Sequence, residues 1–167
     1  ELLLMVRKRE EKLNRQKLSA SDLTIKGSLE FLRMLHGKGI KLYLTSGTDV
    51  EDVKHEAGLL GYAGLFEGRI HGATGDIRHE AKKMVLDRLL DQIGESEAAS
   101  IVTFGDGPVE IRETRKHGGI TVGVASNELR RFGLNESKRT RLIKAGAGFI
   151  VPDFSSPSAL LEILNIK

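Results

Sequence analysis

Two polar residues, Thr45 and Asp106, each follow an apolar run and precede a glycine-bearing turn and a helical pattern. Backbone N–H groups at the start of a helix carry a partial positive charge and bind anions. In open parallel sheets, moreover, ligands bind beyond the carboxyl ends of the strands. The two positions therefore predict a site for a small anion, with Ser46 and Gly47 as further contacts beside Thr45. Taken alone, each turn also fits a capped or self-bonded turn without a ligand.

Two carboxylates follow the apolar run 101–104. Asp106 lies between two glycines, and Glu110 comes four residues after it, one helical turn away. Mg²⁺ is bound in proteins through one or two carboxylates and keeps several of its waters. We therefore predict that Asp106 holds Mg²⁺ and that Glu110 supports it.

Lys82 is the cation that helical phase directs toward the buried side of its helix. On the helix predicted over 80–93, it shares a stripe with apolar residues four, seven and eleven positions further on. Its neighbour Lys83 aligns instead with Asp87, in the pattern of a solvated ion pair. Lys82 is thus a candidate for neutralising a phosphate, and the alternative is a lysine whose stem covers the edge of the core.

Strands alternate with helices along the chain. Thr48 and Glu51 have the spacing of a capping box that opens a helix. The strands are apolar on both faces, which indicates an α/β fold with a parallel sheet covered on both sides. The predicted strands are 40–44, 101–104, 120–125 and 149–151, with a shorter extended piece at 65–71, and the predicted helices include 29–35, 80–93, 109–117 and 158–164.

Composition restricts the function. The chain has 167 residues, 40% of them hydrophobic, and a formal charge of +3. This charge is too small to indicate a nucleic-acid partner, and no apolar run is long enough for a membrane helix. Cysteine is absent, which excludes disulfides, thiolate metal sites and cysteine nucleophiles and favours a cytoplasmic location.

Several other chemistries are excluded by their motifs. His71, Asp76 and His79 lie close in sequence, but their spacing matches no compact zinc site. The chain has neither a Gly-x-Ser-x-Gly elbow nor a P-loop, which argues against an esterase triad and a nucleotide-phosphate cradle.

Together these residues resemble the haloacid dehalogenase superfamily, whose phosphatases form and hydrolyse an aspartyl-phosphate. The run 42–45 looks like its second motif, Lys82 like the third, and 105–110 like the fourth, Gly-Asp-x-x-x-Asp, with Glu110 in place of the last Asp. The resemblance covers about 24–154. It implies a Rossmann-like three-layer sandwich, in which Thr45 and Ser46 bind the phosphoryl group, Lys82 balances its charge, and Asp106 holds Mg²⁺.

One motif of that superfamily is missing. Its first strand ends in Asp-x-Asp, which supplies the nucleophile and the acid/base, and no Asp-x-Asp occurs in this chain. We therefore expect residues 1–23 to be the helical tail of a cap or linker and 24–167 to be a core without its first strand. The sheet should be incomplete at its N-terminal side, and another segment of the same protein or another chain should fill the gap.

The sequence therefore predicts the later part of an Mg²⁺-dependent hydrolase of small phosphate monoesters, inactive without the upstream aspartate. Two alternatives stay open. A phosphoglucomutase-like or phosphonate-cleaving relative would use the same core, and a non-catalytic regulatory module would keep the fold without the nucleophile.

Overall fold

The computed structural model describes residue 11 and residues 19–74 and 81–166. Most of the expected tail at 1–23 lies outside the described residues, so its assignment stays a prediction. The elements in chain order are the helices α2 (Ala20–Leu23) and α3 (Ser28–Gly37), β1 (Leu44–Asp49), α4 (Val50–Leu59), the 3₁₀ turn η1 (Ala63–Phe66), β2 (Ile70–Ala73), α5 (Ala81–Ile93), α6 (Glu95–Ala98), β3 (Val102–Gly105), α7 (Pro108–Lys116), β4 (Ile120–Val124), α8 (Glu136–Ala145), β5 (Phe149–Val151) and α9 (Pro157–Ile163).

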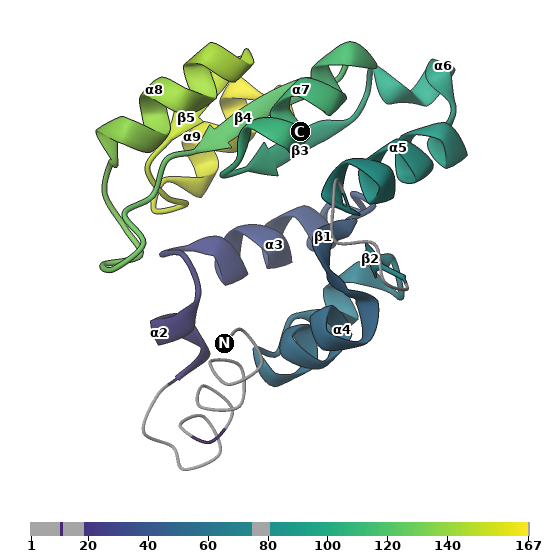
Figure 1. Ribbon diagram of the computed structural model, residues 1–167. Coiled ribbons are helices and arrows are strands. Elements are labelled where there is room, and N and C mark those ends of the chain that lie inside the picture. Colours follow the sequence, from purple (N-terminus) through teal and green to yellow (C-terminus); the bar gives the residue numbers. More distant parts are fainter. Residues whose placement is uncertain (1–10, 12–18, 75–80, 167) are drawn as a thin grey trace.

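The described strands form two separate parallel sheets. In one, β1 pairs with β2, and Leu44 lies opposite Ile70. In the other, the order is β3-β4-β5, and Val102 lies opposite Ile120. The predicted α/β class with parallel strands is confirmed. Figure 1 shows the three-stranded sheet above α3 and the two-stranded sheet beside α4 and α5.

Helices cover both faces of the three-stranded sheet (Figure 1), which makes the three layers. On one face, Ile111 of α7 packs with Leu142 and Ala145 of α8, and both Ile111 and Leu142 are fully buried. On the other face, Phe31 of α3 packs against residues of β3 and of the segment after β5. The layer made by α3 follows from the sequence, because α3 places the apolar residues Phe31 and Leu35 on one buried face.

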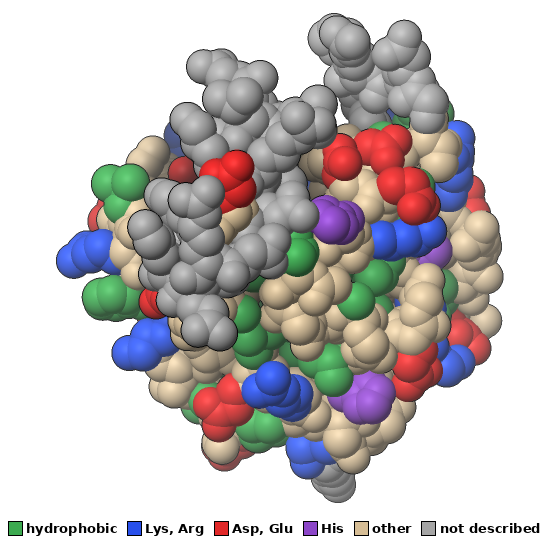
Figure 2. All heavy atoms as spheres, turned by 90° about the horizontal axis from the view of Figure 1, so that it is seen from below, with side chains coloured by type: hydrophobic (Ala, Val, Ile, Leu, Met, Phe, Trp, Pro, Cys, Tyr) green, Lys and Arg blue, Asp and Glu red, His purple; other side chains and the backbone are tan. Residues whose placement is uncertain are grey.

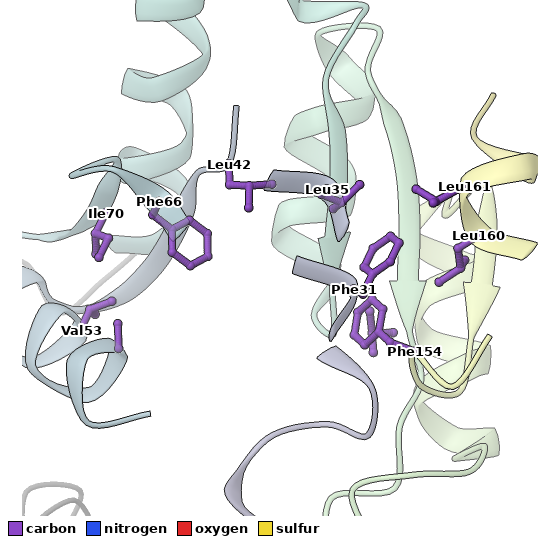
Figure 3. Close-up of a cluster of buried hydrophobic side chains, with 11 residues drawn as sticks. Phe31, Leu35, Leu42, Val53, Phe66, Ile70, Phe154, Leu160 and Leu161 are labelled. Atoms are coloured by element: carbon purple, nitrogen blue, oxygen red, sulfur yellow. The ribbon is translucent and has the colours of Figure 1, made fainter. Parts of the chain in front are cut away.

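Phe31 lies at the centre of the larger core. Its ring is 5.3 Å from that of Phe104, edge to face, and 5.3 Å from that of Phe154 in a stacked arrangement. Figure 3 shows Phe31 and Phe154 near Leu160 and Leu161 at one end of the cluster, with a second group around β2 and α4 at the other end. The two groups belong to one cluster that reaches across both sheets.

A cavity of about 1080 Å³ lies between the two sheets. Its walls include consecutive residues of the stretch 42–45 on one side and of 101–104 on the other, with apolar residues of α3 and α5 between them. Neither β1 nor β3 has a second neighbour among the described strands. The unpaired edges of both strands therefore face an apolar space, as expected for an incomplete sheet.

Three local expectations need correction. The strand begins at Leu44, and 40–43 are not in a strand. The neighbouring strand β2 begins at Ile70, opposite Leu44, and the cavity lies on the other side, so no described strand pairs with 40–43. Residues 45–49 continue β1 with an irregular register. The helix cap is Asp49, whose carboxylate accepts the N–H of Glu51 at 2.9 Å, so the predicted Thr48 capping box is wrong.

The apolar pattern of the sequence did not indicate helix α8, because only a few of its residues contact the core. Only Leu142 and Ala145 of its apolar residues are buried, together with one lysine, Lys138. Asn135 caps it by accepting the Lys138 N–H at 2.9 Å. This helix borders the loop that carries Asp106, because its residues Lys138 and Arg141 both contact Asp106.

Among residues 11, 19–74 and 81–166, no helix is both long enough and apolar enough to span a membrane. On the face seen in Figure 2, basic and acidic side chains are interspersed. The mixed charge on that face agrees with the small net charge of the sequence.

Candidate active site at the strand ends

The C-terminal half of β1, the first turn of α5 and the first turn of α7 meet at one place. A Cβ added to Gly47 would lie 3.2 Å from the Cβ of Lys82, so the backbone of β1 packs closely on the start of α5. From there the Lys82 ammonium reaches the Glu110 carboxylate, 2.8 Å away. The carboxyl ends of β1 and β3 therefore lie at the same edge of the fold, as the sequence predicts.

Lys82 pairs with a buried carboxylate although it is itself partly exposed. Its side chain is 35% exposed, whereas that of its partner Glu110 is only 5% exposed. Lys83 instead lies 3.7 Å from Asp87 in an exposed ion pair. The two adjacent lysines are similarly exposed, at 35% and 39%, and differ in their partners, because Glu110 is buried and Asp87 is exposed.

Two glycines just before α7, Gly105 and Gly107, leave room for the Glu110 side chain. It is the third residue of α7, and its Oε1 accepts the N–H of Gly107, the helix cap, at 2.9 Å. A Cβ at Gly105 would overlap the Glu110 side chain, and one at Gly107 would lie 3.1 Å from its Oε2. The glycines thus make room for a glutamate at this position, which is one methylene longer than an aspartate.

Asp106 faces a different lysine from the one expected nearby. Its Oδ2 lies 3.1 Å from the Nζ of Lys138, which also lies 3.0 Å from Glu128. The Asp106 side chain is 55% exposed, while that of Lys138 is 9% exposed. Burial alone would lower the pKa of Lys138, but its hydrogen bonds to Glu128 and Asp106 outweigh burial and raise that pKa.

Thr45 and Ser46 lie on β1 at the edge of the site. Thr45 is half-buried, pairs in register with His71 and borders the cavity. The Ser46 hydroxyl accepts the N–H of Thr48 at 3.1 Å. In the structure, Gly47 of β1 packs against Lys82 and Glu110 of α7 pairs with it, whereas Asp106 pairs with Lys138.

His71 is a further polar group next to Thr45. Its Nε2 is buried without a hydrogen bond, its ring stacks on Tyr43 at 6.2 Å, and desolvation lowers its pKa. The neutral imidazole is therefore favoured. His79 and Asp76 lie outside the described residues, and within the described part no group of three metal-binding side chains occurs.

The two carboxylates can be tested as Mg²⁺ ligands. Asp106 is exposed enough to reach an ion, and the Oε2 of Glu110 is buried without a hydrogen-bond donor. An ion that keeps several waters needs only one or two carboxylates. Asp106 and Glu110 therefore fit as part of the ligand set of an Mg²⁺ ion. In the structure, each of these carboxylates is paired with a lysine ammonium.

Lys138 and Glu128 are the site residues that sequence reasoning missed. The available signal was a lysine in the first turn of a helix that follows a buried strand. Basic residues are disfavoured at helix N-termini, so its presence there indicates a nearby carboxylate. The partner itself could not be identified, because 32 residues separate Lys138 from Asp106.

Known structures share this fold. A predicted phosphatase from Clostridium acetobutylicum superposes with a TM-score of 0.64 at 20% identity, over 82% of this chain and 59% of that one. A haloacid dehalogenase family hydrolase from Deinococcus radiodurans, solved with bound phosphate and sodium, has a TM-score of 0.65 at 16% identity, over 84% and 60%. A protein assigned as a beta-phosphoglucomutase from Thermotoga maritima has a TM-score of 0.57 at 23% identity, over 84% and 59%.

These likenesses show that the chain has the fold of haloacid dehalogenase-like hydrolases, as the sequence resemblance implies. The chain spans about 60% of the length of those proteins. No family model matches the sequence, and no curated protein matches it.

Proposed function

We propose that this chain is the part of a phosphohydrolase that binds and polarises the phosphoryl group of a small phosphate monoester. One observation carries the proposal: Lys82 joins the C-terminal half of β1 to the first turn of α7, packing against Gly47 and reaching Glu110 at 2.8 Å. These three segments correspond to the second, third and fourth motifs, and their contact is what phosphoryl binding at this edge requires.

Each residue has a proposed role. The Thr45 hydroxyl and the N–H groups of Ser46 and Gly47 would donate hydrogen bonds to the phosphoryl oxygens. Lys82 would offset their negative charge while staying bound to Glu110. Positioned donors and cations of this kind provide most of the catalysis in phosphoryl transfer.

The proposal includes Mg²⁺, held by Asp106 with Glu110 in support. When bound, the ion would supply positive charge to the phosphoryl oxygens. Asp106 is the better placed of the two, because its side chain is exposed at the strand end while Glu110 is buried. The role of Glu110 on this account is mainly to hold Lys82 and the Gly107 cap.

The nucleophile would come from a strand that fills the cavity between β1 and β3. The walls are mostly apolar, and both strands offer unpaired backbone groups there, which a strand satisfies and a compact ligand does not. We propose that this strand ends in Asp-x-Asp, that its first aspartate forms the aspartyl-phosphate, and that it comes from another segment of the same protein or another chain. The absence of cysteine supports a cytoplasmic setting.

Two other functions are each supported by a specific observation. A mutase or phosphonate-cleaving role would use the same core, in line with the likeness to a protein assigned as a beta-phosphoglucomutase. A non-catalytic module is favoured by the lack of Asp-x-Asp and by the lysine partner of each site carboxylate. Turnover in the presence of an Asp-x-Asp strand would exclude the module.

Phosphate binding tests the proposed site without requiring turnover. Broadening of the ³¹P signal of inorganic phosphate by the chain should be lost in Lys82→Met. Lys83→Met is the matched control, because it removes the neighbouring exposed charge, and it should leave the broadening unchanged. Equal broadening by the wild type and Lys82→Met would contradict the proposal.

A further inference from the structure

Lys138 is a buried lysine in a position where its charge is unfavourable. It is the third residue of α8, whose N-terminus carries a partial positive charge. Its side chain is only 9% exposed, and a buried ammonium is costly unless it is paired. Nearby negative charge must therefore compensate for it.

Two carboxylates from different loops provide that charge. Asp106 lies in the loop between β3 and α7, and Glu128 lies in the loop between β4 and α8. Their side chains are 55% and 74% exposed, so water can solvate both of them without Lys138. The lysine thus depends on the carboxylates, whereas the carboxylates do not depend on the lysine for solvation.

The Asp106 carboxylate is also the one proposed above to take Mg²⁺. A divalent cation bound to it would lie in the field of the Lys138 ammonium, 3.1 Å from Oδ2. Like charges at such short range repel, and the repulsion is strongest where burial limits screening. The same ammonium also competes directly for one of the two carboxylate oxygens.

We propose that Lys138 is the counterion of Asp106 in the metal-free protein and sets the affinity of this carboxylate for divalent cations. The inference rests on the proposed function, since it needs the metal to bind at Asp106. Lys138 is a positioning residue on this account: it holds the Asp106 side chain in the metal-free state and weakens metal binding. A lysine that merely tethered the two loops would not oppose the metal.

The experiment measures the binding of Mn²⁺, as a probe for Mg²⁺, to the full chain by the electron paramagnetic resonance of free Mn²⁺. Lys138→Met should bind Mn²⁺ about tenfold more tightly than the wild type, from the loss of one nearby positive charge. Lys138→Arg keeps the charge and should restore wild-type affinity. Lys144→Met removes an exposed charge from the same helix and should change the affinity by less than about twofold.

The effect should require Asp106, so that Asp106→Asn weakens binding and abolishes the gain in the double variant with Lys138→Met. Equal or weaker binding by Lys138→Met, with Asp106→Asn still weakening it, would overturn the inference alone. Unchanged binding by Asp106→Asn, or no binding by any variant, would overturn the metal role of the proposed function as well. Lys138→Gln gives a second neutral variant if Lys138→Met does not fold.

Discussion

The ammonium of Lys82 lies 2.8 Å from the carboxylate of Glu110, and this ion pair joins the first turn of α5 to the first turn of α7. The two partners differ in solvent exposure: Glu110 is nearly inaccessible to solvent, while about a third of the Lys82 side chain is exposed. Glu110 therefore depends on its partner, since a buried carboxylate without one is costly.

Removing Lys82 alone should destabilise the protein more than removing both partners. Lys82→Met leaves Glu110 buried and charged, and should lower the free energy of unfolding by about 2 kcal/mol, discounted for the partial exposure of the lysine. The double variant Lys82→Met/Glu110→Gln should recover part of this loss. Urea unfolding of the four proteins of the cycle measures the coupling; an additive double variant would contradict it.

Gly105→Ala should be strongly destabilising, because a Cβ at this position would overlap the Glu110 side chain. We expect a loss of about 2 kcal/mol together with displacement of Glu110 from Lys82. Gly58→Ala in α4 is the control: a Cβ there meets nothing within 4 Å, and alanine should leave stability unchanged or raise it by about 0.5 kcal/mol. Thermal unfolding of both variants distinguishes them, and similar midpoints would count against the packing described.

Phe31→Ala should lower stability by about 3 kcal/mol, because the variant loses the ring that contacts both Phe104 and Phe154. Arg33→Ala changes an exposed residue of the same helix and should have an effect near zero. Chemical denaturation compares the two. A loss below about 1 kcal/mol for Phe31→Ala would mean that the packing around the cavity is looser than the structure indicates.

Asp153 should give a contribution to stability that depends on pH. Burial alone would raise its pKa, but hydrogen bonds from Ser155 and from the N–H of Gly133 outweigh burial and hold the pKa below the ordinary value of 3.8. A depressed pKa in the folded state means stability that is present above that value and lost as the pH falls through the folded pKa. Asp153→Asn should therefore cost about 1 kcal/mol at neutral pH.

The cost of Asp153→Asn should shrink as the pH falls below 3.8. Urea unfolding of wild type and variant at a series of pH values measures it. A difference that stays constant down to the acid limit would show that the carboxylate charge is not what stabilises the loop.

The sequence was sufficient for features that depend on local periodicity. Helical phase predicted the pairing of Lys83 with Asp87, which the structure confirms, and Lys82 instead reaches the buried Glu110. The parallel arrangement followed from strands that are apolar on both faces. The strand that begins at Leu44 was predicted to begin at residue 40. The first residue of a strand depends on where the neighbouring strand begins, and tertiary structure determines this.

Features that depend on distant partners could not be predicted. The partner of Asp106 is Lys138, on a helix with few buried apolar residues. The cap of α4 is Asp49 and not Thr48, because either side chain fits the local pattern and the backbone after β1 decides between them. The sequence predicted that β1, the start of α5 and the start of α7 lie close together, whereas the individual contacts between them could not be predicted.

The most direct test of the account supplies the missing strand in trans. A synthetic apolar strand peptide ending in Asp-x-Asp is added to the full chain with Mg²⁺, and hydrolysis of an aryl phosphate is followed, with the matched Asn-x-Asn peptide as the control. We predict no turnover by the chain alone or with the Asn-x-Asn peptide, and turnover that saturates with the Asp-x-Asp peptide and is lost in Lys82→Met. Turnover by the chain alone at the same rate, or binding of the Asp-x-Asp peptide without turnover, would contradict the proposed function.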